Sequence, residues 1–145
     1  MAIEWTQKQP EYSIAQPSRR VFECVISYAE WASGHAAKTT GNPLDLRGFK
    51  RVNVTYINNF SGSTVSVTPT PATYVEADET WHDLPALEAE SLAPAATLER
   101  MLKPIAQSPS AGDALCGAMG VTFSVDPSMQ PLRGSFTIVV ECFPE

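Results

Sequence analysis

The sequence has no hydrophobic run long enough to cross a membrane and few residues of the kinds that carry catalysis. No apolar stretch in its 145 residues approaches the roughly eighteen that a spanning helix needs. Residues 1–10 lack the basic start and apolar centre of a secretory signal. We therefore expect a protein that is made and folded in the cytoplasm and has no membrane partner.

Basic residues are also scarce. Ten Lys and Arg residues stand against sixteen Asp and Glu, for a net charge of −6, which is the wrong sign for binding a phosphate backbone. We expect no nucleic-acid partner. No charged residue occurs from Val52 to Val75, whereas seven acids and no base lie between Glu76 and Glu99. A long uncharged β-rich segment indicates that either the fold or a partner covers it.

Only three cysteines and two histidines are present. Cys24 and Cys142 lie in alternating apolar segments, where a thiol behaves as a small buried hydrophobe. Cys116 lies in a glycine-rich loop without an activating environment, and no pair of cysteines has zinc-ligand spacing. Nucleophile-elbow and phosphate-loop motifs are absent as well. We predict a protein that is not an enzyme and has no cofactor.

Alternation of apolar and polar residues predicts that the chain is mainly β. The predicted strands cover residues 20–31, 50–58, 63–68, 72–76, 121–125 and 136–142. The Asn- and Gly-rich residues 58–62 predict a hairpin between the second and third strands, and Pro69 and Pro71 are expected to end the third. The final strand has apolar residues on both faces, which is typical of a central position.

A helical period follows the uncharged segment. Leu98, Met101, Leu102 and Ile105 are spaced as one helical face, and Leu84, Leu87 and Leu92 suggest a shorter helix before them. The fold class predicted is therefore mainly β (β-rich α+β): an antiparallel sheet or β-sandwich with an inserted pair of short helices at about residues 83–106.

We divide the chain into an extended N-terminal arm, residues 1–19, and a single β-rich domain, residues 20–145. The arm is rich in Gln and Pro, and its Trp5 and Tyr12 are suited to docking. An arm of this kind lies either on a neighbouring subunit or on its own domain.

One acidic cluster is a candidate metal site. Carboxylates and an imidazole occur within eight residues, at Glu76, Asp78, Glu79, His82 and Asp83. EF-hand spacing and the H-E-x-x-H motif are absent, and acids at this position also suit the start of a helix. We predict no bound metal and keep these five residues as the candidate ligands.

Two functional hypotheses remain. The first is a non-enzymatic structural or assembly protein that forms homo-oligomers or docks on a larger particle, with Trp5, Tyr12, Val65 and Val67 as interface candidates. Small domains of this style occur in phage and viral particles as decoration, tail-completion or minor capsid proteins, so a virion component is included in this hypothesis. The alternative is a carbohydrate- or ligand-binding β-sandwich module that uses Trp5, Trp31 and Trp81.

Overall fold

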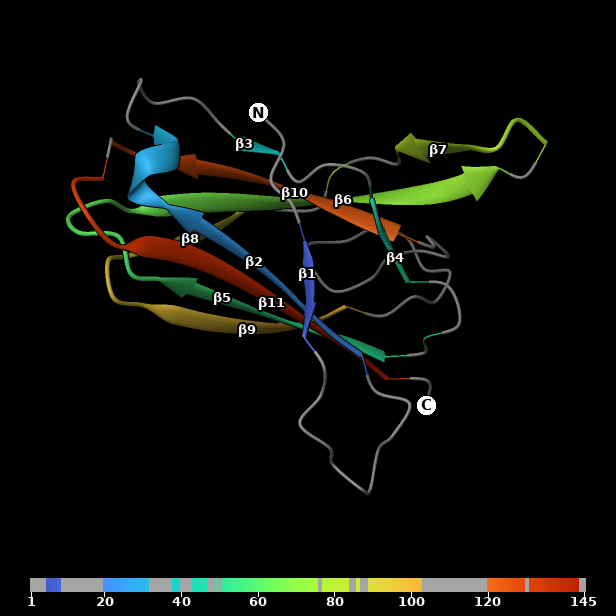
Figure 1. Cartoon of the computed structure of the whole chain (residues 1–145), viewed down its shortest axis with the longest axis horizontal. Helices are drawn as coiled ribbons and strands as arrows, with labels where there is room; N and C mark the ends of the chain where they lie inside the picture. Colours follow the sequence, from blue (N-terminus) through green and yellow to red (C-terminus); the bar gives the residue numbers. More distant parts are fainter. Residues whose placement is uncertain are drawn as a thin grey trace.

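Two antiparallel sheets make up the part of the chain that the computed structural model describes, with one short 3-10 helix, η1 (Tyr28–Trp31). The described residues are 5–8, 20–31, 38–39, 43–46, 49, 51–75, 77–83, 86, 89–102, 120–129 and 131–143. None of them forms a helix long and apolar enough to cross a bilayer. The two sheets pack face to face as a β-sandwich (Figure 1), so the predicted mainly-β antiparallel class is confirmed.

The first sheet has five strands. In spatial order they are β1 (Thr6–Lys8), β2 (Arg20–Ser27), β11 (Ser135–Phe143), β5 (Arg51–Asn58) and β9 (Thr97–Leu102). The last strand of the chain, β11, lies in the middle of this sheet between β2 and β5, as its apolar character predicted. β1 comes from the predicted arm and pairs with β2 of its own domain. Tyr12 and the rest of residues 9–19 lie outside the described residues.

The second sheet is built on two long strands, β6 (Val65–Val75) and β10 (Gly120–Pro127). The far edge of β10 pairs with β3 (Lys38–Thr39) and β4 (Leu44–Asp45). The far edge of β6 pairs with β8 (Glu90–Leu92) and then with β7 (Thr80–Asp83). The strands that hold the uncharged residues 52–75, β5 and β6, are therefore interior strands of their sheets.

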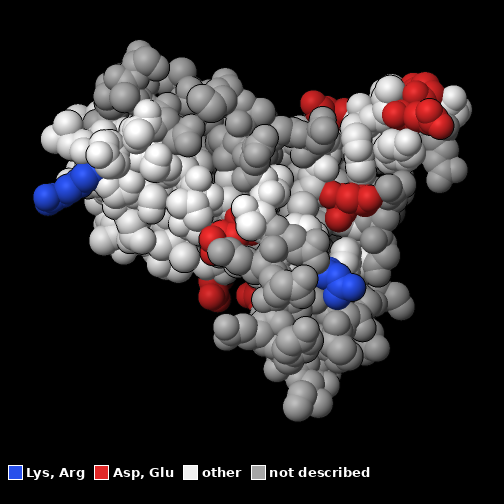
Figure 2. Space-filling model, in the orientation of Figure 1, with Lys and Arg blue, Asp and Glu red and all other residues white. Residues whose placement is uncertain are grey.

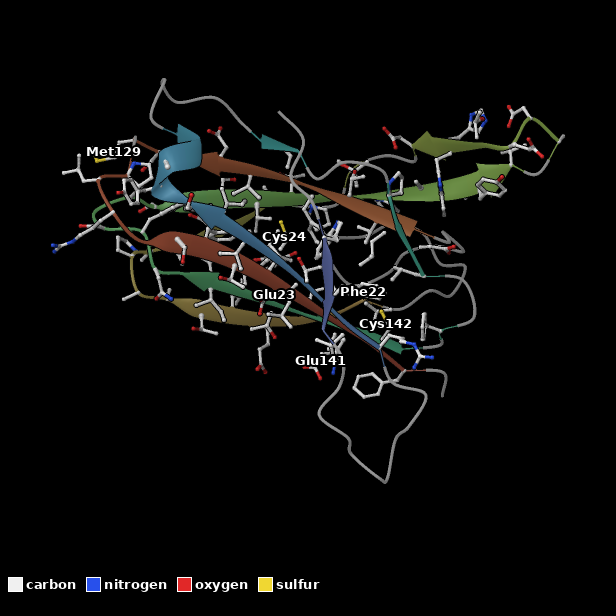
Figure 3. All side chains as sticks on the ribbon, in the orientation of Figure 1. Phe22, Glu23, Cys24, Met129, Glu141 and Cys142 are labelled. Atoms are coloured by element: carbon white, nitrogen blue, oxygen red, sulfur yellow. The ribbon has the colours of Figure 1, made fainter. Side chains whose placement is uncertain are left out.

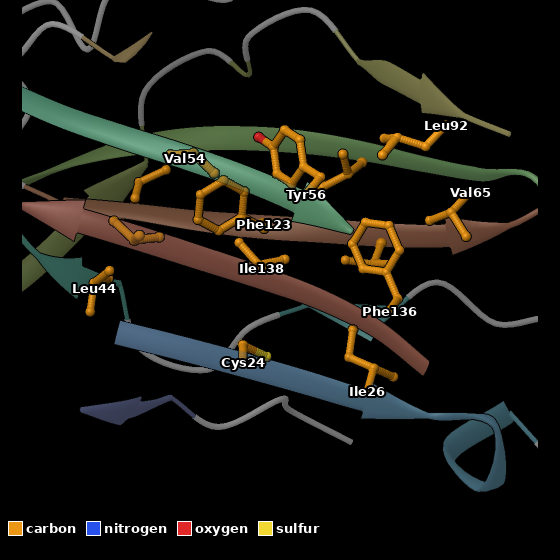
Figure 4. Packing of buried hydrophobic residues seen from close by; sticks show 14 of the residues in the cluster. Cys24, Ile26, Leu44, Val54, Tyr56, Val65, Leu92, Phe123, Phe136 and Ile138 are labelled. Atoms are coloured by element: carbon orange, nitrogen blue, oxygen red, sulfur yellow. The ribbon is translucent and has the colours of Figure 1, made fainter. Parts of the chain in front are cut away.

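Alternate side chains from both sheets fill the space between them. Tyr56 packs edge-on against Phe123 of the facing sheet at 6.0 Å between ring centroids and stacks with Phe136 at 6.5 Å. Phe60 extends this row, at 6.4 Å from Phe136. Figure 4 shows the other three rings, Tyr56, Phe123 and Phe136, between the strands. All four rings are buried, and burial of each contributes roughly 1.5–3 kcal/mol. The aromatic row therefore joins the two sheets.

The predicted hairpin between β5 and β6 is wrong. The two strands lie in different sheets, and residues 59–64 cross from one sheet to the other. The buried Asn58 amide nitrogen donates to the carbonyls of Ser63 (2.9 Å), Leu92 (3.0 Å) and Ala93 (3.2 Å). Its Oδ1 accepts from the Phe60 amide at 3.1 Å. The asparagine stabilises the crossover from within, whereas the sequence pattern indicated only an exposed turn.

Pro69 and Pro71 do not end the third strand, because β6 continues through both of them to Val75. The backbone groups of alternate residues in a strand point to the same edge, so both prolines direct their nitrogens to one side. On the side of β7 and β8, pairing stops at Val67 and resumes at Ala72. Within the described chain, residues 68–71 have no partner strand on that side, and prolines facing this gap cost no ladder hydrogen bond.

The inserted helices predicted at about residues 83–106 are absent from the described part of that segment. Leu92 lies in β8 and Leu98 in β9, which pairs with β5 at six positions from Val52 to Ile57. The edge of β5 supplies a row of backbone partners, and this pairing outweighs a helical spacing of apolar residues that spans only two turns. Leu84, Leu87 and Ile105 lie outside the described residues.

The Asn58 contacts predict a large loss of stability in an Asn58→Ala variant. Three carbonyls and one amide would lose a buried partner, so we expect the free energy of unfolding to fall by about 2–4 kcal/mol in urea denaturation. The matched control is Asn59→Ala, whose side chain is exposed and whose effect should stay within about 0.5 kcal/mol. Equal effects of the two substitutions would contradict a special role for Asn58.

Candidate functional site

Large exposed apolar side chains gather at one end of the sandwich. We name this surface the apolar end and define it by Val25 (51% exposed), Tyr28 (48%), Met129 (54%) and Leu132 (82%). Figure 3 shows Met129 at this end of the molecule, beside η1. In the described chain the remaining large exposed hydrophobic residue is Val75, in the hairpin that projects from the opposite end. A concentration of exposed apolar side chains at one end of a domain indicates a candidate interaction site.

Backbone hydrogen bonds hold the apolar end in place. The Tyr28 amide donates to the Gly134 carbonyl at 3.0 Å, and the Ser61 amide donates to the Arg133 carbonyl at 3.0 Å. The buried Ser63 hydroxyl donates to the Met129 carbonyl at 2.8 Å. Gly134 has a φ of +95°, and a Cβ there would clash with the carbonyl oxygen of Asn59. The segment carrying Met129 and Leu132 is therefore tied to the crossover between the sheets.

An open hollow of about 440 Å³ lies at the same end. It is lined by Asn59, Phe60, Ser61, Gly62, Pro94, Ala95, Arg133 and Gly134. Arg133 is the one ionisable residue in this lining and is exposed. Ala95 has a φ of +67°, a conformation that is uncommon without glycine, and its amide donates to the Asn58 carbonyl at 2.8 Å. Among the described residues that line the hollow there is no pair of groups for acid–base chemistry, and the Arg133 cation suits a negatively charged partner.

The opposite end carries an acidic tip, the turn between β6 and β7. We name Asp78 and Glu79 the acidic tip; both are exposed, whereas the exposed Asp83 lies at the other end of β7, where it pairs with Ala72. Asp78 accepts from the Thr80 hydroxyl at 2.7 Å and the Thr80 amide at 3.2 Å, and its second oxygen lies 3.0 Å from Nε2 of His82. The Thr80 hydroxyl bond is the main reason that the pKa of Asp78 lies below its usual value of 3.8, with His82 contributing as well. The polar groups of the turn thus order it, and their hydrogen bonds favour the ionised form of the Asp78 carboxyl group.

The candidate metal ligands are only partly brought together. Asp78 and His82 are in contact, whereas Asp83 follows His82 along β7 and therefore points to the other face of the strand. Glu76 lies outside the described residues. No group of three His, Cys, Asp or Glu side chains that could hold a metal ion occurs among the residues the structure describes. Thr80, which no sequence motif marked, belongs to this group: its hydroxyl bonds Asp78 and lies 2.9 Å from His82.

The interface candidates lie in three different environments. Val65 and Val67 are fully buried and pair with inward-facing Leu92 and Val125, so naming them as interface residues was wrong: their face of β6 meets the other sheet. Trp5 is half-buried and packs edge-on against Phe123 at 5.8 Å, with its indole nitrogen buried and unbonded. Tyr12 lies outside the described residues. Of these candidates, only Trp5 keeps part of its described surface open to solvent.

An aromatic pair lies on the outer face of the second sheet. Tyr74 and Trp81 are cross-strand partners with ring centroids 5.3 Å apart in an edge-on arrangement. The Trp81 ring covers Gly120, where a Cβ would lie 2.7 Å from Cζ3 of the indole. Hydroxyl side chains follow on the same face, including the Thr70 and Thr122 pair. The sequence analysis named Trp81 but missed its pairing with Tyr74, because residues 77–83 were expected to lead into a helix.

The prediction for Cys24 and Cys142 is confirmed. Both thiols are fully buried, and Figure 3 shows them on the two neighbouring strands β2 and β11. Burial, together with the charge of the neighbouring Glu141, raises the pKa of Cys142 to about 12. This thiol is therefore not available as a nucleophile near neutral pH. Cys116 lies outside the described residues.

The bonds at the acidic tip predict a measurable change in Asp78 ionisation. A Thr80→Val variant loses the hydroxyl donor, so we expect the pKa of Asp78 to rise toward 3.8 in an NMR titration of its carboxyl carbon. Because the folded pKa lies below the unfolded one, the stabilisation is present above pH 3.8 and disappears as the pH falls through the folded value. Thr68→Val, in the same sheet but away from the turn, is the control. An unchanged Asp78 titration in Thr80→Val would contradict the assigned cause.

Comparison with known proteins gives distant structural similarity alone. No protein-family model matches the chain, and no curated protein matches it. Among solved structures it is similar to a crystal structure of the Clostridium thermocellum N-terminal endo-1,4-beta-D-xylanase 10B, CBM22-1 and GH10 modules complexed with xylohexaose. The TM-score is 0.42 and the sequence identity 14%, and the match covers 97% of this chain and 24% of that one. A similarity this distant carries no inference about function.

Proposed function

We propose that this chain is a non-enzymatic assembly protein that associates with further copies of itself through the apolar end. The observation that carries the proposal is the distribution of exposed hydrophobic residues: four of the five in the described chain lie at that end. Large apolar side chains with an arginine beside them are typical of the energetically important centre of a protein interface. A phage or viral particle, which the sequence suggested, is one assembly of this kind.

The energetic case depends mainly on Leu132 and Met129, the two most exposed large hydrophobic residues of the described chain. Burying such a side chain contributes roughly 1.5–3 kcal/mol, and part of this gain offsets the loss of translational and rotational freedom on association. Because both residues lie on a turn that is tied to the crossover, little further ordering is needed when they bind. An exposed apolar surface that is ordered before binding supports reversible association.

Support for a non-enzymatic role comes from the environments of the reactive groups. The described thiols, Cys24 and Cys142, are buried in the core, and His82 lies on an exposed hairpin in contact with Asp78. The described residues hold no nucleophile next to a base in a concave site, which is the arrangement that covalent catalysis needs.

Removing apolar surface should weaken self-association. We expect a Met129→Ser, Leu132→Ser double variant to sediment as a smaller species than the wild type across a concentration series, because the apolar contacts are lost. The control exchanges the two residues, Met129→Leu with Leu132→Met, and should associate like the wild type since apolar surface is kept. A wild type that stays monomeric at every concentration, or a serine variant that associates normally, would refute the proposal.

A second candidate function, carbohydrate binding, is favoured by the Tyr74–Trp81 pair. Sugars stack on aromatic rings and hydrogen-bond to hydroxyl and carboxylate groups, and this face also carries Thr70 and Thr122. Asp45 and Asp83 are exposed at the two ends of the cross-strand row that runs through Gly120 and Ala72. The arrangement suits a neutral polyhydroxylated ligand better than an anionic one.

The carbohydrate candidate is tested by calorimetric titration with xylo-, cello-, manno- and malto-oligosaccharides. We expect one of these series to bind the wild type and to lose binding in Trp81→Ala, because the stacking surface is removed. Trp5→Phe, which changes a half-buried tryptophan that packs on the core, is the matched control and should bind normally. Flat titrations with all four series, or equal loss in both variants, would dismiss this candidate.

A further inference from the structure

We propose that copies of this chain associate head to tail, with the acidic tip of one copy seated in the hollow at the apolar end of the next. The inference rests on the proposed self-association and adds which surfaces meet. The occupant of the hollow is thus the β6–β7 turn of a second, identical chain.

Shape complementarity is the first argument. The molecule is elongated, and the β6–β7 hairpin projects at one end of its longest axis while η1 and the apolar end lie at the other (Figure 1). The projecting element is a narrow two-stranded turn centred on Asp78 and Glu79. The hollow at the far end has a volume of about 440 Å³ and is open to solvent. A projection and a hollow at opposite ends of one chain permit an interface between unlike surfaces.

Charge complementarity is the second argument. Figure 2 shows acidic side chains on the projecting hairpin and a basic side chain at the opposite end. Among described residues, the lining of the hollow contributes a single charge, Arg133, whereas the acidic tip contributes Asp78 and Glu79. Two acidic tips repel each other, so electrostatics favours contact between unlike ends.

The large exposed hydrophobic residues are also distributed over the two ends of the molecule. Val75, 36% exposed, lies just before the turn that carries the acidic tip, and the other four large exposed hydrophobic residues lie at the apolar end. Seating the hairpin in the hollow would bring Val75 toward Met129 and Leu132. One interface would then bury members of both groups, with the Arg133 charge at its rim.

Both surfaces are ordered before they meet. The tip is stabilised by the bonds that join Asp78 to Thr80 and His82, and the hollow by those of Asn59 and Ser61 to Ser135 and Arg133. Association therefore costs little conformational entropy. Because the two surfaces differ, each added copy leaves one of each kind open, and the product is a chain of copies or a closed ring.

The test uses charge reversal at each end. Arg133→Glu alters the hollow, and Glu79→Lys with Ala77→Lys, two exposed positions of the turn, makes the tip positive while keeping the side chains that bond Asp78. We expect each to weaken self-association about tenfold or more, which corresponds to about 1.4 kcal/mol, as measured by sedimentation equilibrium. A triple variant that combines all three substitutions should restore association to near the wild-type level, because the attraction is rebuilt with opposite signs. Arg20→Glu makes the same charge change as Arg133→Glu away from both ends and should have little effect.

The outcomes separate this inference from the proposed function. If the tip variant associates like the wild type, or the triple variant does not regain association, the acidic tip is not seated in the hollow, and head-to-tail packing is overturned while self-association through the apolar end stands. If the Met129→Ser, Leu132→Ser variant also associates normally, both fail. Circular dichroism and thermal unfolding confirm that each variant is folded before its mass is measured.

Discussion

The buried amide of Asn58 is the contact on which the arrangement of the two sheets depends. Asn58 and Ser63 are the two fully buried polar residues of the described chain, and they lie at the start and end of the crossover from β5 to β6. The Asn58 side chain binds the crossover and the turn between β8 and β9 together. Its backbone bonds Ala95 and Ala96 of that turn as well. If the Asn58 amide were left without hydrogen-bond partners, the loss of folding stability would equal the contribution of several surface contacts.

The surfaces at that end of the molecule follow from this crossover. Gly134 packs so closely on Asn59 that any side chain would clash with its carbonyl, and Ser63 holds Met129 through its hydroxyl. The turn that carries Leu132 is therefore fixed to the crossover while its apolar side chain faces solvent. A residue that the fold holds rigidly and leaves exposed is available to a partner at low entropic cost. The same packing that stabilises the sandwich thus creates its main candidate interface.

The charge distribution has a structural explanation in the middle of the molecule and a candidate functional one at its ends. The uncharged residues 52–75 form two interior strands, whose inner side chains are buried and whose outer ones include Thr68 and Thr70 beside Ser124 and Thr122. The fold pairs or buries most of this segment, apart from one edge of residues 68–71 in the described chain. The acidic tip and Arg133 are set apart at opposite ends, so the net charge of −6 is an average over regions of different character.

Local alternation of side chains was enough to predict the β class and most positions of β2, β5, β10 and β11, because burial on one face of a strand leaves a period-two pattern. The same pattern predicted the central place of β11 and the burial of Cys24 and Cys142. Tertiary structure alone decided which strands pair. The positions of neighbouring strands decide that the connection from β5 to β6 crosses between the sheets. They also allow Pro69 and Pro71 inside β6 and place Leu98 in the edge strand β9. Backbone pairing is non-local and carries no sequence signal of its own. Strand pairing places Tyr74 beside Trp81, and the packing of the two sheets places Arg133 beside the apolar residues of the hollow.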